Sequence, residues 1–113
     1  MRLLKGLSLA VALTAPISSF AYTGNELQDW ARSFELSQQN RTLDWKSSML
    51  VGYVAGVAET VRGILICPTT KATHLQGAAI VSKFIRANPE RWSEQASDLV
   101  VAALLTAYPA CKT

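Results

Sequence analysis

Apolar residues recur at helical spacing along nearly the whole chain, and no strand-like alternation is seen. The clearest stripe combines Leu27, Trp30, Ala31 and Phe34, which stand at positions i, i+3, i+4 and i+7. Such a stripe is typical of an amphipathic helix with one face on a core. We therefore expect a first helix from Glu26 to about Leu36, followed by a polar linker from Gln38 to Arg41.

Capping residues and prolines divide the remainder of the chain. Asn25 and Gln28 stand three residues apart, as the two partners of a capping box do, and Thr73 is a good N-cap for a third helix. The fold class predicted is all-α, a compact four-helix domain. The remaining helices are expected from about Leu43 to Gly63, from His74 to about Ala87, and from near Pro89 or after Ser93 to about Tyr108.

The predicted second helix is apolar all round from Met49 to Ala58, a pattern typical of a helix buried on several sides. Gly52 and Gly56 lie one turn apart on one of its faces. A glycine inside a helix costs up to about 1 kcal/mol relative to alanine. We interpret the two glycines as a helix-packing site that another helix backbone approaches closely, with a flexible hinge as the alternative.

The second and fourth helices are the most apolar, and two amphipathic helices provide little surface to cover them. Contiguous exposed apolar area usually marks a partner surface. A homodimer is the simplest prediction. The alternative is that loop residues 64–68 cover the apolar surface within one chain.

Cys67 and Cys111 are the only cysteines. In an exported chain an even pair of cysteines indicates a disulfide, which here would close a loop of about 45 residues and contribute roughly 4 kcal/mol. It would join the ends of the second and fourth helices. Two free thiols are the alternative.

Residues 1–21 have the features of a secretory signal peptide: two early basic residues, a short apolar run and small residues up to Ala21. The run from Leu7 to Ala15 is too short to span a bilayer as a helix. We expect cleavage after Ala21, which leaves residues 22–113 as one exported domain without membrane insertion. A membrane-anchoring or buried helix is the alternative.

Loss of the signal peptide nearly neutralises the chain. The full sequence has 11 Lys and Arg against 8 Asp and Glu, and two of the basic residues, Arg2 and Lys5, would leave with the signal. The mature domain then carries a net charge of about +1, and no clustered basic face of the kind that binds phosphate backbones is seen. We therefore predict no nucleic-acid binding.

The side chains that carry chemistry are sparse. His74 is the only histidine and is interpreted as a solvated surface residue, and no serine stands in a nucleophile-elbow context. Two cysteines and one histidine do not complete a zinc shell. Glu59 and Arg62, and likewise Glu90 and Glu94, are interpreted as solvated helix faces. We expect no catalytic residue, no metal and no cofactor, and hence no enzyme.

Trp45 and Trp92 stand at the starts of the second and fourth predicted helices. A hydrophobic staple at a helix start is the preferred interpretation for both. An interface anchor is the alternative, since Trp is favoured at binding hot spots.

The order and spacing of five segments resemble the Rap/Tai family of immunity proteins from bacterial type VI secretion systems. The resemblance covers nearly all of the mature chain. It implies a small, periplasmic, all-helical protein, often dimeric, that binds and blocks a peptidoglycan amidase injected by a neighbouring cell. The segments are 24-GNELQDW-30, 52-GYVAGVAETVRG-63, 66-ICP-68, 76-QGAAIVSKFIRANPERW-92 and 97-SDLVVAALLTAYPAC-111.

One departure from the family concerns cysteines. Relatives often carry a second cysteine pair, and the corresponding positions here are Ala31 and Leu50. The resemblance then implies that packing of Trp30, Ala31 and Leu50 replaces a covalent link between the first two helices.

The sequence therefore predicts a periplasmic immunity protein that occupies the cleft of its cognate amidase with a rigid helix end or loop. We expect the contact surface near residues 64–74 or 88–95. The alternative is a small periplasmic helical chaperone of the acid-activated type, which exposes apolar surface when its acids are protonated. The candidate effector-binding residues are Lys71, His74, Arg91 and Trp92.

Overall fold

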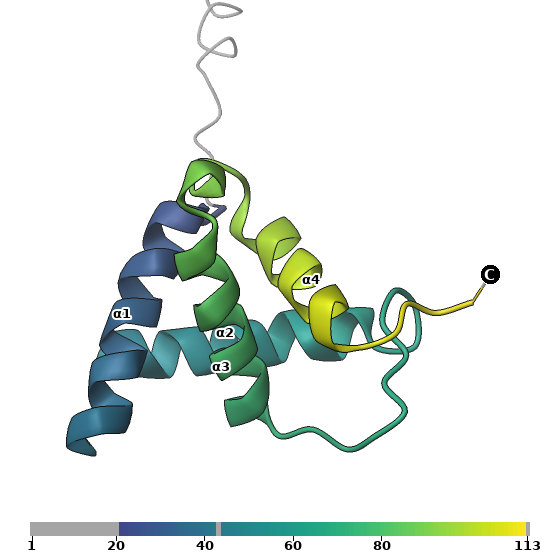
Figure 1. Ribbon diagram of the computed structural model, residues 1–113, viewed down its shortest axis with the longest axis horizontal. Helices are drawn as coiled ribbons and strands as arrows, with labels where there is room; N and C mark the ends of the chain where they lie inside the picture. The colour runs from purple at the N-terminus through teal and green to yellow at the C-terminus, as the bar shows by residue number, and fades with distance from the viewer. Residues whose placement is uncertain (1–20, 43, 113) are drawn as a thin grey trace, which may run out of the picture.

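A computed structural model describes residues 21–42 and 44–112, and the predicted signal peptide, apart from Ala21, lies outside the described residues. Figure 1 shows α2 crossing behind α1 and α3, while α4 runs at an angle toward the C-terminal end of α2. The elements are α1 (Gly24–Asn40), α2 (Trp45–Val61), α3 (His74–Ala87), the short 3-10 helix η2 (Pro89–Arg91) and α4 (Ala96–Ala107).

The all-α prediction is confirmed, since the described residues form four α-helices and only isolated β-bridges. None of these helices is both long and apolar enough to cross a membrane. Helix α3 has the predicted bounds, because Thr73 caps its start and Asn88 with Pro89 ends it. Of the two predicted starts for the fourth helix, the one after Ser93 is correct for α4, and Pro89 opens η2 instead.

The first helix begins two residues before its predicted start. Thr23 is the N-cap of α1, and it forms the capping box with Glu26 rather than Asn25 with Gln28. The Thr23 backbone N–H donates to Glu26 Oε1 at 2.7 Å. This hydrogen bond and a second from the Thr23 hydroxyl lower the pKa of Glu26 below its usual value.

Helix α1 also continues past the predicted end. Gln38 to Asn40, expected to be a linker, form its last turn. Arg41 then ends the helix in the left-handed region, with φ at 58°, and its backbone N–H donates to the Ser37 carbonyl at 2.7 Å. The linker between α1 and α2 is therefore shorter than the polar composition suggested.

Helix α2 begins at Trp45, where the Asp44 carboxylate caps it. Asp44 Oδ1 accepts the Ser47 backbone N–H at 2.8 Å and the Ser47 hydroxyl at 2.7 Å. Both hydrogen bonds lower the pKa of Asp44 below its usual value, the one from the backbone N–H more than the one from the hydroxyl. The helix ends at Val61 rather than Gly63, because Arg62 leaves the helical conformation with ψ at 130°; Gly63 then adopts a φ of +80°, which glycine tolerates best.

The first-helix stripe is confirmed, since all four of its residues are buried in the core. The prediction that α2 is buried on several sides is wrong: only Ser47, Leu50 and Val54 of this helix are buried. The helix is apolar all round, yet the other three helices cover one side of it. The remaining apolar side faces out.

The predicted close approach of a second helix of this chain at Gly52 and Gly56 is also wrong. A Cβ atom added at either glycine would meet no atom within 4 Å apart from its chain neighbours and the backbone of its own helix. The two glycines instead line an open, largely apolar groove between α2 and α4. Nothing within the described chain offsets the helix-propensity cost of these glycines.

The contact between α1 and α2 is made by packing, as the absent cysteine pair implied. Ala31 and Leu50 are both completely buried in the same core. Beside them, the ring centroid of Trp30 lies 4.8 Å from that of Tyr22 and 5.8 Å from that of Tyr53. This edge-to-face group holds the start of α1 against α2.

The predicted disulfide is present. Cys67 and Cys111 are joined across Cα atoms 4.9 Å apart, and the described residues contain no free cysteine. The bond ties the segment after α2 to the segment after α4, so the long connection from α2 to α3 is anchored near its middle.

Candidate partner-binding site

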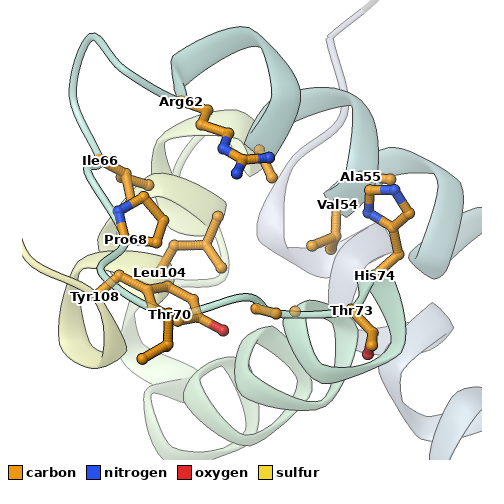
Figure 2. A pocket seen from close by; sticks show the side chains of 13 residues that line it. Val54, Ala55, Arg62, Ile66, Pro68, Thr70, Thr73, His74, Leu104 and Tyr108 are labelled. Carbon is orange, nitrogen blue, oxygen red and sulfur yellow. The ribbon is translucent and has the colours of Figure 1, made fainter.

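A pocket of about 90 Å³ lies between α2, the start of α3 and the end of α4, under the segment 62–73 that joins α2 to α3. Figure 2 shows the Arg62 side chain reaching over the space between Ile66 and Pro68 on one side and Ala55 and His74 on the other. The apolar part of the lining consists of Val54, Ala55, Ala58, Ile66, Pro68, Ala72, Gly77, Leu104 and Tyr108.

The turn after α2 forms one wall of this pocket. Gly63, with its positive φ, reverses the chain, and its backbone N–H donates to the Ile66 carbonyl at 2.8 Å. Ile66 is thereby turned inward and is only 3% exposed. The preceding Ile64 is 70% exposed, so the turn separates one buried isoleucine from one that faces solvent.

The disulfide region fixes the same wall to the end of the chain. The Cys67 backbone N–H donates to the Pro109 carbonyl at 2.9 Å, and the Cys111 N–H donates to the Leu65 carbonyl at 3.0 Å. Two backbone hydrogen bonds therefore flank the covalent link. This wall is held in place before any partner arrives.

The opposite edge of the pocket is the start of α3. The Thr73 hydroxyl accepts the Gln76 backbone N–H at 3.1 Å, and Gln76 Oε1 accepts the Thr73 N–H at 2.7 Å. This capping box fixes the direction in which α3 leaves the loop. His74, the first residue of α3, is placed at the pocket as a consequence.

The charges near the pocket are not paired as the sequence suggested. The solvated pair of Glu59 with Arg62 requires both residues on one helix, but Arg62 lies beyond the end of α2, with ψ at 130°. Glu59 Oε2 instead lies 3.4 Å from His74 Nε2, and both side chains are more than half exposed. The side chains of Arg62 and Lys71 form no ion pair with the described residues.

The other two candidate residues serve the local structure. The Arg91 guanidinium donates two hydrogen bonds of 2.9 Å to the Glu94 carboxylate, which raises the pKa of Arg91 and lowers that of Glu94. Trp92 is half-buried and donates its indole N–H to the Ile85 carbonyl at 2.8 Å. Trp92 also packs against the core, four residues before α4 begins at Ala96.

The structure does not bring the four candidate residues together. Lys71 and His74 lie at the start of α3, while Arg91 and Trp92 follow its end. At a rise of about 1.5 Å per residue, the 14 residues of α3 separate the two pairs by about 20 Å. The two surfaces at residues 64–74 and 88–95 are therefore distinct.

Sequence reasoning missed the exposed apolar side chains. Trp45 was interpreted as a staple, but it is 65% exposed, with the Lys46 ammonium 5.7 Å from its ring centroid. Leu75, in the first turn of α3, is 56% exposed.

The described residues contain no group of three or more His, Cys, Asp or Glu side chains that could hold a metal ion. What the described part offers is a small helical domain closed by one disulfide, with a preformed apolar pocket beside unpaired cationic side chains. Such a surface is suited to binding a partner.

The comparisons with known proteins agree with a role in binding a partner protein. The family model of the Rap1a immunity proteins matches residues 23–111, and the chain therefore belongs to the Rap1a immunity protein family. The family resemblance predicted from the sequence is thus confirmed. A search of curated proteins and a search of solved structures each returned no match.

Proposed function

We propose that this chain is a periplasmic immunity protein that binds and inhibits a peptidoglycan amidase delivered by a type VI secretion system. The observation that carries the proposal is the match to the Rap1a immunity proteins over residues 23–111. Periplasmic location is supported by the signal-like residues 1–21 and by the disulfide, a bond that persists in oxidising compartments. The amidase as target rests on the sequence resemblance.

Inhibition would proceed by steric occlusion rather than by chemistry. An inhibitor that is rigid before binding loses little conformational entropy when it enters a cleft. The loop 62–73 has this property, because the disulfide, the turn at Gly63 and the Thr73 capping box hold it at three points. Exposed Ile64 and Leu65 on the same loop would supply apolar contact area.

Of the two predicted surfaces, residues 64–74 are the better effector-binding site. Lys71 and His74 keep their side chains exposed there, and Lys71 has no ion-pair partner among the described residues. At residues 88–95 the corresponding groups are already engaged, Arg91 by Glu94 and Trp92 by Ile85. Recruiting them for a partner would require breaking these contacts.

The test uses the mature chain and any secreted peptidoglycan hydrolase that is encoded beside its gene. Isothermal titration should give a saturable complex, and release of stem peptides from purified sacculi should stop at stoichiometric inhibitor. Full-length chain should rescue cells in which the hydrolase is exported, whereas a version lacking residues 1–21 should not. Absence of binding at micromolar concentration to any neighbouring effector would contradict the proposal.

A matched pair of charge reversals assigns the surface. Lys71→Glu should weaken hydrolase binding about tenfold, because a charge at the rim of an interface steers association. Glu90→Lys, a reversal in the exposed η2 turn, should leave it unchanged. The opposite ranking would place the contact at residues 88–95.

We further propose that the chain is a homodimer through the open face of α2. Tyr53, Val57, Val61 and Leu65 line the groove over Gly52 and Gly56, together with Val101 of α4. Two copies related by a twofold axis would bury these side chains, and the glycines would allow the two α2 backbones to approach closely. The helix-packing role predicted for Gly52 and Gly56 would then operate between chains.

Light scattering coupled to size exclusion should return twice the monomer mass for the wild-type chain. Gly56→Leu should return the monomer mass, because its side chain would fill the groove. Ala79→Leu, which also introduces a leucine but at an exposed position of α3, is the control and should remain dimeric. A wild type that is still monomeric at about 0.1 mM would exclude a dimer with a Kd in the micromolar range.

A further inference from the structure

The pocket under the 62–73 loop has the size of a single side chain. Its volume of about 90 Å³ is smaller than the apolar cavity of about 150 Å³ that accommodates benzene. Sites for metabolites and cofactors usually enclose about 300–1,000 Å³. A group of three or four carbons, such as the side chain of leucine or valine, fits the space available.

The interior of the pocket is apolar and its edge is cationic. Val54, Ile66 and Leu104 are almost completely buried around it. At the edge, Arg62 has no ion-pair partner among the described residues, whereas the His74 ring lies 3.4 Å from the Glu59 carboxylate. Arg62 is therefore the arginine that lines the opening.

The N-terminus of α3 adds a partial positive charge to this edge. The backbone N–H groups of His74 and Leu75 make no hydrogen bond within the described chain, since the Thr73 hydroxyl accepts only from Gln76. Unpaired N–H groups at a helix N-terminus attract negative charge. An occupant with an apolar part and an adjacent carboxylate would therefore satisfy both the interior and the edge.

We infer that this pocket receives one aliphatic side chain of the partner protein, with a neighbouring aspartate or glutamate of that partner contacting Arg62. The inference rests on the proposed function, because the partner is the effector, and it specifies which part of that effector is recognised. Anchor side chains in preformed pockets carry much of the binding energy of protein interfaces. The pocket wall is preformed here by the Cys67–Cys111 bond and its flanking hydrogen bonds.

A titration with short peptides tests the pocket without the effector. The probe is N-acetyl-Leu-Glu-amide, and N-acetyl-Leu-Gln-amide is its uncharged match. Methyl resonances of Val54 and Leu104 in the mature chain should shift on addition of the charged peptide, with a Kd on the order of 1 mM. The uncharged peptide should bind about fivefold more weakly, as expected for one partly exposed charge pair.

Variants of the chain locate the binding. Arg62→Gln should weaken the charged peptide about fivefold and leave the uncharged peptide unchanged. Arg32→Gln, a change at an exposed arginine of α1, is the matched control and should affect neither. Ala58→Leu should remove binding of both peptides by filling the pocket, and Ala55→Leu provides a second filled variant if the first does not fold.

Three results of the titration would overturn the inference. Unshifted methyl resonances would show that the pocket takes no side chain. Equal affinity for the two peptides would remove the role assigned to Arg62. Tighter binding of free isovalerate than of either peptide would make this a site for a small carboxylate rather than a protein anchor.

A final arm separates this inference from the proposed function. The neighbouring secreted hydrolase is titrated into wild-type chain and into Ala58→Leu, with folding of both verified by thermal denaturation. Binding that is lost at least tenfold in Ala58→Leu supports the pocket as the anchor site. Equal binding to both would overturn the anchor role of the pocket and leave the immunity function intact. Binding to neither would count against the immunity function. In that case the peptide titrations still test whether the pocket receives a side chain.

Discussion

Gly24 lies against Trp92 so closely that a Cβ atom on the glycine would stand 2.7 Å from the Trp92 Cα atom and 2.8 Å from its carbonyl oxygen. The Gly24 backbone N–H also donates to the Glu94 carbonyl at 2.9 Å. The first turn of α1 is thus joined to the segment between α3 and α4. Only a residue without a side chain allows the two backbones to approach this far.

The first prediction follows from this contact. Gly24→Ala should lower the free energy of unfolding by about 1–3 kcal/mol, because the clash is with backbone atoms that cannot rotate away. Gly52→Ala adds the same methyl group where no atom lies within 4 Å, and should be neutral or stabilising by up to about 1 kcal/mol. Urea denaturation at low protein concentration measures both, and equal effects would show that the Gly24 contact is not tight.

Removal of the disulfide should cost a large part of the stability. Cys67 and Cys111 are 44 residues apart in sequence, and closing such a loop contributes about 4 kcal/mol in the chain-entropy model. The double variant Cys67→Ser with Cys111→Ser should therefore unfold at much lower urea concentration. Dithiothreitol should destabilise the wild type to a similar extent and leave the double variant unaffected; insensitivity of the wild type would contradict the role of the bond.

The cap of α3 should have a measurable effect at the edge of the pocket. Thr73→Ala removes the hydroxyl that accepts the Gln76 N–H, and should cost about 1 kcal/mol. For a domain of this size that corresponds to a fall in Tm of about 4–8 °C. Thr69→Ala, in the same loop but without a capping role, is the control. Thr73→Ser should retain most of the stability, and a Ser variant as unstable as the Ala variant would argue against capping.

Acid should destabilise the fold in a defined window. Glu26, Asp44 and Glu94 all have a pKa lower in the folded chain than their ordinary values, through hydrogen bonds from Thr23, Ser47 and Arg91 respectively. Such carboxylates stabilise the fold above their unfolded pKa, and the contribution is lost as pH falls through the folded pKa. The urea midpoint should therefore be flat from pH 7 to about 5 and decline below about 4.5.

Asp44→Asn identifies one source of the decline. Asparagine is also a good N-cap but does not titrate in this range, so the variant should lose less stability between neutral and acid pH than the wild type. Glu90→Gln, which also removes one carboxylate but from an exposed position without a capping hydrogen bond, is the control for the change in net charge. A decline in Asp44→Asn as steep as that of the wild type would show that this cap is not involved.

Local patterns in the sequence determined the helices and the class of protein. Helix α3 was predicted to the residue because its signals are local: Thr73 caps it and Asn88 with Pro89 ends it. The stripe from Leu27 to Phe34 identified a buried face, because a spacing of 3.6 residues per turn places those side chains together wherever the helix packs. Two cysteines in a chain with signal-like residues 1–21 left one pairing, which the structure contains.

Tertiary structure alone decided which faces are covered. Helix α2 is apolar on every side, so its sequence does not distinguish the side that meets the core from the side that forms the groove at Gly52 and Gly56. Glu59 and Arg62 were paired by helical spacing, but α2 ends one residue before Arg62 and leaves that guanidinium beside the pocket. The periodicity of a sequence predicts which side chains share one face of a helix. Which of those faces is covered depends on how segments distant in sequence pack against the helix.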